Sequence, residues 1–177
     1  MAKSSKGRRG RRRISVSIAE SKTLRLFREG SVLLAGADFE QISIARFSKA
    51  AGISVGAFYV RFKDKDAFLD FVIANTFAEA RTAFQEQANI GYVPNLADAL
   101  VRQFSSPEFS GIVRAAVKLG FLAERHRAPY DEYRRFVSQY LAELLLADVK
   151  KRERRQRIAA IDAALAILTQ SALFPNS

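Results

Sequence analysis

The sequence contains no cysteine and no tryptophan, and it has one histidine and one methionine. Without cysteine there is no disulfide and no thiolate chemistry, which fits the reducing cytoplasm where we expect the protein to act. The single histidine, His126, has no glutamate three residues before it, so it does not indicate a metal site. We expect His126 to be an exposed or loop residue.

Sequence motifs typical of membrane proteins, secreted proteins and several enzyme classes are also missing. No apolar run reaches the roughly 18 residues that a membrane span requires, and no apolar segment follows the basic N-terminus as in a secretory signal. No glycine-rich phosphate loop or nucleophile elbow is present. We therefore expect no membrane partner, no cofactor and no enzyme activity.

Positive charge is concentrated in the first third of the chain. The formal net charge is +11; residues 1–65 contain 15 Lys and Arg against 5 Asp and Glu, whereas residues 66–177 contain 14 against 13. This asymmetry favours a polyanionic partner over a general effect on solubility. A basic tail without a ligand is the alternative.

The most basic segment is the N-terminus. Residues 1–13 carry seven basic side chains and no large apolar residue after Met1, so burial cannot offset the entropy of ordering this segment. We predict a disordered basic arm over residues 1–18, which, taken with the helix-turn-helix pattern described below, would contact the DNA backbone or minor groove. A flexible tail that only aids solubility is the alternative. The arginines of the arm are Arg8, Arg9, Arg11, Arg12 and Arg13.

The rest of the chain has the apolar spacing of helices, three and four residues apart, and no sustained alternation of the kind that strands show. The pattern predicts an all-α protein with an N-terminal helix-turn-helix domain of three helices over residues 19–65. A second helical domain follows over residues 66–177. Predicted helices cover 21–35, 43–52, 54–62, 64–88, 96–104, 107–125, 129–149 and 155–174, with Ser43, Ser54 and Asp64 as N-caps and Pro107 and Pro129 in first turns.

Two short predicted helices meet across Ala51-Gly52-Ile53. A glycine at a helix C-terminus relieves the strain of a tight left-handed turn, and a short turn between two such helices is the helix-turn-helix pattern. The second of these helices begins with small residues, Ser54, Gly56 and Ala57, so its N-terminus can approach another surface closely.

The segment Ile42 to Leu69, ISIARFSKAAGISVGAFYVRFKDKDAFL, resembles the signature of the TetR/AcrR family of transcriptional regulators. The matching residues are Ser43, Ala51-Gly52-Ile53-Ser54, Gly56, Tyr59, Phe62, Lys65 and Leu69. The strong resemblance extends from Leu26 to Leu69, about a quarter of the 177 residues. It implies a ligand-responsive regulator, expected to be a repressor, that binds a palindromic operator in double-stranded DNA as a homodimer.

The resemblance also implies roles for single residues. Ser54 would cap the recognition helix and reach a phosphate, and Val55, Gly56 and Ala57 would face the major groove. Tyr59 and Lys65 would contact phosphates, whereas Phe62 would anchor the core. Two departures concern cations: Arg61 replaces the usual histidine and still suits phosphate, and Ala45 stands where an arginine is common, next to Arg46. Ser43 and Arg46 complete the predicted DNA-binding set.

The resemblance also implies that residues 66–177 form a helical ligand-binding and dimerisation domain. In the family this domain usually encloses a small-molecule pocket, and the many aromatic residues here suit the walls of a pocket for a small, largely apolar effector. The last predicted helix is apolar on two sides, so one side can pack on its own domain and the other on a second copy. The predicted dimer interface contains Ile161, Ala164, Leu165 and Leu168.

Two other classes of function remain open. A helical protein that packages nucleic acid or binds RNA without sequence preference would show the same basic balance. A ratio of specific to non-specific affinity of about 10³ or more would exclude it. A helical enzyme with a basic tail is the third class, and the lack of a catalytic constellation speaks against it.

Overall fold

The computed structural model describes residues 22–89, 93–146 and 151–174. Those residues form helices joined by turns and include no strand, which confirms the all-α fold. A helix over residues 22–36 comes first. It is followed by η1 (Phe39–Gln41), α2 (Ile44–Ala50), α3 (Val55–Tyr59), α4 (Lys65–Asn89), α5 (Val93–Ser105), α6 (Pro107–Gly120), α7 (Glu124–Leu145) and α8 (Lys151–Leu173).

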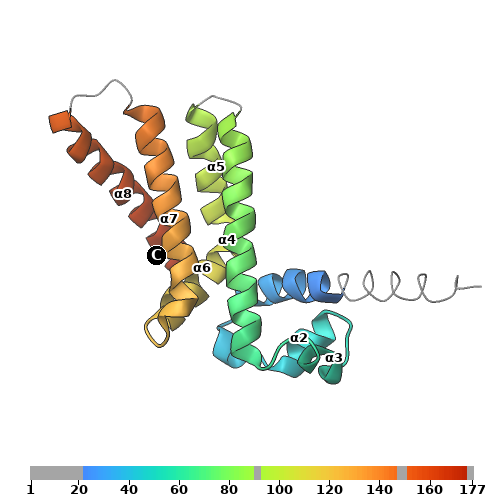
Figure 1. Ribbon diagram of the computed structural model, residues 1–177. Helices are drawn as coiled ribbons and strands as arrows, with labels where there is room; N and C mark the ends of the chain where they lie inside the picture. The colour runs from blue at the N-terminus through green and yellow to red at the C-terminus, as the bar shows by residue number, and fades with distance from the viewer. Residues whose placement is uncertain (1–21, 90–92, 147–150, 175–177) are drawn as a thin grey trace, which may run out of the picture.

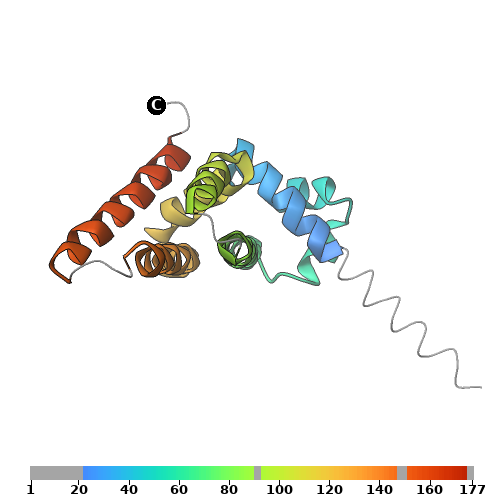
Figure 2. The same cartoon turned by 90° about the horizontal axis from the view of Figure 1, so that it is seen from above.

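The helices form two units that share α4. The helix over residues 22–36, α2 and α3 gather at one end of α4, and α5 and α7 run alongside its other part (Figure 1). Seen from above, α8 lies obliquely beside α7 at the far side of the bundle from the first unit (Figure 2). α6 lies beneath α7 and reaches back towards the helix over residues 22–36.

Helix starts are fixed by side chains that accept backbone N–H bonds. The hydroxyl of Ser43 accepts from the N–H of Arg46 at 3.1 Å, and the hydroxyl of Ser106 accepts from Phe109 at 3.3 Å. The carboxylate of Asp64 accepts from the N–H of Ala67 at 2.7 Å. Each bond satisfies a donor that has no partner inside its helix, so the predicted caps Ser43 and Asp64 are confirmed.

Phenylalanine rings join the first unit to α4. Phe47 from α2, Phe58 from α3 and Phe68 from α4 are almost fully buried, with ring centroids 4.9 Å apart for Phe47–Phe68 and 5.4 Å for Phe58–Phe68. Phe62 packs against the same ring of Phe68 at 5.1 Å, as its predicted role as a core anchor requires. The buried core continues without a break into α5–α8.

Several predicted boundaries were wrong around the turn between α6 and α7. The predicted helix over 107–125 ends at Gly120, and α7 begins at Glu124, so Pro129 lies inside α7 and not in its first turn. Burial decides the shift: starting at Glu124 turns His126 towards α4, where it is 4% exposed. The Nδ1 atom of His126 lies 2.7 Å from a carboxylate oxygen of Asp70. The expectation that His126 is an exposed or loop residue is therefore wrong.

Two shorter differences concern α3 and α5. α3 ends at Tyr59 and not near Phe62, because residues 60 and 61 form a turn, although the N–H of Phe62 still bonds to the carbonyl of Phe58 at 3.0 Å. α5 begins at Val93, three residues before the predicted start. The predicted basic arm over residues 1–18 lies outside the described residues.

Candidate nucleic-acid interface

The turn between α2 and α3 depends on one glycine. Gly52 has a φ of +63° and is the single residue with positive φ in the part of the chain that the structure describes. Its N–H bonds to the carbonyl of Lys49 at 3.1 Å, and the next N–H, of Ile53, bonds to the carbonyl of Ser48 at 2.9 Å. Left-handed backbone favours glycine, so the motif's Gly52 is where the helix-turn-helix needs it.

α3 presents most of its surface to solvent. Its N-cap Ser54 accepts a hydrogen bond from the N–H of Ala57 at 3.1 Å, and Phe58 is its single fully buried side chain. Tyr59 is 53% exposed and Val60, the residue after the helix, is 84% exposed. A helix held by one buried ring and one cap keeps its outer face free for a partner.

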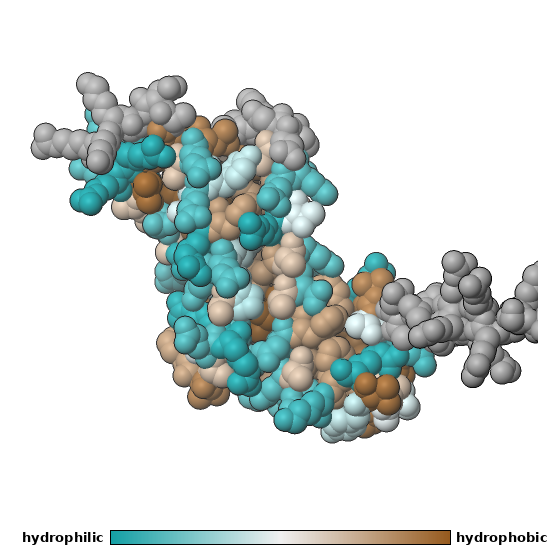
Figure 3. All heavy atoms as spheres, viewed as in Figure 1, coloured by the Kyte–Doolittle hydropathy of each residue, from teal (hydrophilic) through white to brown (hydrophobic). Residues whose placement is uncertain are grey.

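The predicted small residues lie on this outer face. Val55 and Gly56 are exposed and Ala57 is half-buried. A Cβ added to Gly56 would meet nothing closer than the hydroxyl of Ser54 at 3.9 Å. The N-terminal turn of α3 is thus low in profile, which lets its backbone come close to a docked molecule. Hydrophobic side chains are also visible on the α2–α3 end of the surface (Figure 3).

α2 contributes Ser43 and Arg46, which are both exposed. Ser43 uses its oxygen as acceptor for the cap and keeps its hydroxyl hydrogen to donate. Arg46 makes no side-chain hydrogen bond or ion pair with the described residues. Both lie on the same helix-turn-helix as α3.

Two predicted phosphate contacts have partners inside the chain. Arg61 donates from Nη1 to the carbonyl of Ala57 at 2.7 Å and is half-buried. The guanidinium thereby satisfies a carbonyl at the C-terminal end of α3, where a cation is favourable. Arg61 therefore stabilises α3 directly.

Lys65 has a similar internal role. Its ammonium donates to the carbonyl of Glu40 at 3.2 Å and lies 4.2 Å from the centroid of the Phe39 ring. Desolvation by burial lowers the pKa of Lys65, and the carboxylates of Glu40 and Asp66 oppose that shift. The ammonium ties η1 to the start of α4, and it retains donors for a further acceptor.

The sequence pattern missed Arg25. The guanidinium of Arg25 lies close to the α2–α3 turn, 3.8 Å from where a Cβ on Gly52 would be. No spacing rule identifies it, because it belongs to the helix over residues 22–36, about 27 residues before Gly52 in the chain. Residues 22–65 contain eight Lys and Arg against four Asp and Glu, so this end of the molecule is basic without the arm. The arm residues Arg8, Arg9, Arg11, Arg12 and Arg13 lie outside the described residues.

The predicted dimer residues lie together on one apolar groove of about 550 Å³ between α5, α7 and α8. Leu165 forms its floor and is 3% exposed, Ile161 and Leu168 are half-buried, and Ala164 is exposed. The side chain of Leu165 is therefore buried by contacts within its own chain, and little of it is exposed for contact with a second chain. The exposed residues of α8 that line the groove include Ala160, Ala164 and Ile167, and Ile167 is 68% exposed.

The aromatic residues of the second unit fill its interior. Phe77 lies 5.6 Å from Phe109, 5.2 Å from Tyr130 and 5.8 Å from Tyr133, measured between ring centroids. The groove is lined by alanine, valine, leucine and isoleucine. These rings therefore pack on one another and do not line this groove.

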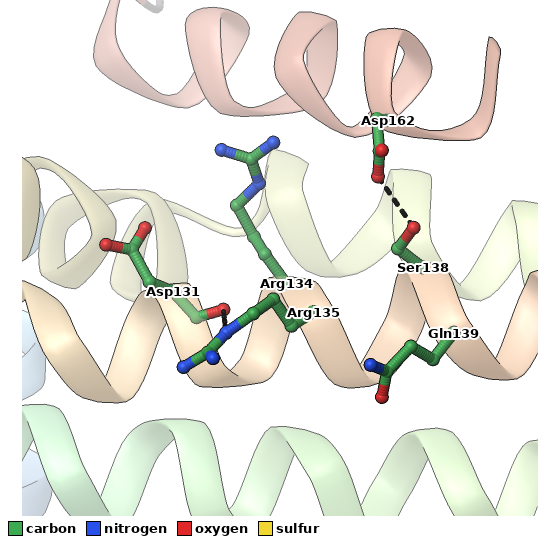
Figure 4. A pocket seen from close by; sticks show the side chains of 6 residues that line it. All are labelled: Asp131, Arg134, Arg135, Ser138, Gln139 and Asp162. Carbon is green, nitrogen blue, oxygen red and sulfur yellow. Dashed lines mark hydrogen bonds between the residues drawn. The ribbon is translucent and has the colours of Figure 1, made fainter. Parts of the chain in front are cut away.

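A second cavity, of about 500 Å³, lies between α7 and α8 and is polar. Arg134 extends from α7 towards α8 between Asp131 and Asp162, and the hydroxyl of Ser138 donates to Asp162 at 2.6 Å (Figure 4). Arg135 points to the other side of α7, where its Nε donates to the carbonyl of Asp131 at 3.4 Å. The cavity's two carboxylates and two guanidinium groups balance, so it has no net charge.

A third cleft, of about 450 Å³, lies between the two units. Its walls come from the helix over residues 22–36, from α4 and from α6, and Phe27, Val32, Ala80 and Phe109 are among them. Its acidic residues are Glu79 and Glu108. A molecule in this cleft would touch the helix-turn-helix unit and the second unit at once.

No sequence family and no curated protein matches the chain, whereas its fold is found in solved structures of transcriptional regulators. Reduced NemR from E. coli has a TM-score of 0.65 at 18% identity, covering 86% of each chain. The fatty acid degradation regulator FadR from Bacillus halodurans has a TM-score of 0.62 at 17% identity, over 86% of this chain and 84% of that one. NalD, the secondary repressor of an efflux pump in Pseudomonas aeruginosa, has a TM-score of 0.57 at 15% identity, over 90% and 87%.

These likenesses show the fold: a helix-turn-helix unit followed by a helical unit, as in TetR-like regulators. Among the residues described, no group of three acidic or histidine side chains is placed to hold a metal ion. None of the described helices is long and apolar enough to cross a membrane.

Proposed function

We propose that the protein is a transcriptional regulator that reads double-stranded DNA through α3. The observation that carries this proposal is the geometry of that helix, which is fixed by Ser54 and Phe58 and leaves Val55, Gly56 and Tyr59 exposed. The major groove admits a helix and carries a base-specific pattern of donors and acceptors. The solved regulators with the same fold support this reading.

Within this proposal, the first turn of α3 reads base edges and residues around it bind phosphates. Val55, Gly56 and Ala57 face the bases, and the hydroxyls of Tyr59, Ser54 and Ser43 donate to phosphate oxygens. Exposed Arg46 is the principal cation of α2. Arg61 and Lys65 act first by holding α3 and α4 in place.

The proposed active species is a homodimer on an inverted repeat. A helix-turn-helix dimer needs two reading heads about 34–36 Å apart, one turn of DNA. The apolar groove and the adjacent face of α8 supply a surface for the second copy: Ala160 and Ala164 allow close approach, and Ile167 offers exposed apolar area. In this arrangement Ile161 and Leu168 lie at the interface, with Leu165 beneath it.

We further propose that the regulator is a repressor released by a small, largely apolar effector, which binds the cleft between the two units. The cleft's volume is within the usual range for ligand pockets. One structure of this fold, FadR from Bacillus subtilis, was solved in complex with stearoyl-CoA. An occupant that favours one arrangement of the two units shifts the population away from the DNA-binding form.

Selection of bound sequences from a pool of random DNA duplexes tests the central proposal. We expect two inverted half-sites, bound at least about 10³ times more tightly than random DNA at the same salt concentration. Tyr59→Phe should weaken binding to all sequences by on the order of 1 kcal/mol, with Tyr140→Phe, on α7, as the matched control. A pool that shows no enrichment would instead indicate non-specific binding of nucleic acid.

The dimer is tested by sedimentation. Ile167→Glu should convert dimer into monomer and abolish operator binding, because it places a charge in an apolar contact. Gln170→Glu adds the same charge at an exposed position of α8 that does not line the groove, and it should leave the dimer intact. Tight operator binding by a protein that sediments as a monomer at micromolar concentration contradicts the dimer.

A screen of apolar ligands tests the effector. We expect ligands that raise the melting temperature to weaken operator binding, because they bind one arrangement of the two units. Ala83→Trp, which would fill the cleft from α4, should remove both effects. Ligands that stabilise the protein and never change DNA binding would contradict the coupling.

A further inference from the structure

One face of α6 is in direct contact with the helix-turn-helix unit. At Gly111 the backbone of α6 meets the C-terminal end of the helix over residues 22–36. A Cβ on Gly111 would lie 2.3 Å from the carbonyl oxygen of Leu34 and 2.8 Å from the Cα of Ala35. Since real Cβ atoms do not approach other atoms so closely, only glycine permits this crossing.

Arg114, one turn further along α6, bridges the ends of two helices. Its guanidinium donates to the carbonyl of Ala35 at 3.1 Å and makes longer contacts with the carbonyls of Leu34 at 3.5 Å and Ala172 at 3.4 Å. Leu34 and Ala35 belong to the last turn of the helix over residues 22–36, and Ala172 to the last turn of α8.

The chemistry of these three acceptors is the same. The last four carbonyls of a helix have no partner within it, and they carry the negative end of the helix dipole. A guanidinium has five donors in a fixed fork, so a single arginine can serve two helix ends at once. A lysine ammonium has no such fork and cannot hold both ends in one geometry.

A third contact extends the same face of α6. Lys118, four residues after Arg114, makes an ion pair of 2.9 Å with Asp38, in the segment between the helix over residues 22–36 and η1. The hydrogen bond that the ammonium of Lys118 donates to the carboxylate of Asp38 raises the pKa of Lys118. Both side chains are largely exposed, so this pair contributes less than the bridge at Arg114.

We propose that Arg114 is the positioning residue that sets the orientation of the helix-turn-helix unit relative to α8. Displacement of the C-terminal end of α8 would then move the helix over residues 22–36, and with it α3. The inference rests on the proposed function only in that the unit so positioned reads DNA. We call the contacts of Arg114 with the carbonyls of Leu34, Ala35 and Ala172 the Arg114 joint. Because α8 also carries the proposed dimer surface, this joint would fix the distance between the two helix-turn-helix units of a dimer.

The distance between two spin labels measures this orientation without DNA or effector. The chain has no cysteine, so Lys49→Cys on α2 and Gln170→Cys on α8, both exposed, give two labelled sites in an otherwise unreactive protein. We expect one narrow distance distribution when the labelled protein is diluted with an excess of unlabelled protein, so that each dimer carries at most one labelled chain. Arg114→Met removes the donors and keeps an apolar stem, and it should give a distribution at least twice as wide.

Two further variants separate positioning from folding. Arg114→Lys keeps the charge and should also broaden the distribution, even where Arg114→Met reduces the yield of folded protein. Arg134→Met is the matched control, because Arg134 is a half-buried arginine on α7 with no hydrogen bond or ion pair to the described residues. It should leave the distribution narrow.

The proposal is overturned if Arg114→Lys, and Arg114→Met where it folds, keep the narrow distribution, or if Arg134→Met broadens it equally. Because the labels report without DNA, the result is independent of the operator selection. Broadening in a protein that selects no DNA sequence would support the joint and contradict the proposed function. A narrow distribution in an operator-binding Arg114→Lys protein would contradict the joint alone.

Discussion

Replacing Gly111 by alanine should separate the two units by a distance that the structure defines. The new methyl carbon would lie 2.3 Å from the carbonyl oxygen of Leu34 and 2.6 Å from its carbonyl carbon. A carbon and a carbonyl oxygen normally stay about 3.3 Å apart or more, so the helix backbones must move by about 1 Å. The neighbours are backbone atoms and cannot relieve the clash by a change of rotamer.

The expected cost follows from two opposing effects. Overpacking of a well-packed contact costs about 1–3 kcal/mol, and alanine in place of glycine within a helix gives back about 0.5–1 kcal/mol. Taken at the middle of each range, the two effects lower the free energy of unfolding by on the order of 1 kcal/mol. For a chain of this size each kcal/mol lowers the melting temperature by about 2–4 °C, so a loss of a few degrees is expected.

Urea unfolding followed by circular dichroism at the helix band measures this change. Gly36→Ala is the matched control, because Gly36 ends the helix over residues 22–36 and a Cβ there would meet no atom within 4 Å. Its stability should stay the same or rise. If Gly111→Ala unfolds at the same urea concentration as the parent protein or at a higher one, the close crossing of α6 and the helix over residues 22–36 is refuted.

Three other perturbations have defined outcomes. Deleting residues 2–13 should raise the Kd for the selected DNA and flatten its salt dependence, because fewer counterions are released, while the preferred sequence stays recognisable; a wholly different selected sequence would show that the arm reads bases. Ser54→Ala should lower the free energy of unfolding by about 1 kcal/mol through loss of the cap, and Ser105→Ala, exposed at the end of α5, should not. Burial raises the pKa of Tyr133 and of Tyr130, so the folded chain keeps phenol protons that the unfolded chain loses near pH 10. The free energy of unfolding, measured in urea, should therefore fall as the pH rises above about 10. The fall should be less steep in Tyr133→Phe. Simultaneous ionisation of all five tyrosines in the folded protein would contradict this.

Local rules predicted the helix-turn-helix well. Caps and tight turns depend on a few consecutive residues, so the sequence alone identifies Ser43, Ser54 and Asp64 as N-caps and Gly52 as the left-handed residue of the turn. The burial of Phe62 also followed from the motif. These features need no information about distant parts of the chain.

Contacts between segments far apart in the sequence could not be predicted in this way. Lys65 meets the carbonyl of Glu40, 25 positions earlier, and Arg114 meets Ala35, 79 positions earlier. His126 is buried against Asp70 because α7 starts before Pro129, which a proline rule for helix starts places wrongly. The periodicity of α8 identified two apolar sides, and only packing decides that Leu165 faces inwards and Ile167 outwards.

α4 runs without interruption for 25 residues from the phenylalanine cluster to the far end of the second unit. At 1.5 Å per residue it is a rod of about 37 Å. A tilt of about 5° about one end of such a rod moves the other end by about 3 Å, close to the spacing between successive base pairs. A small tilt of α4 in the second unit would thus displace the helix-turn-helix unit by about the rise of one base pair, so under the proposed function the register on DNA would report what happens at the opposite end of the molecule.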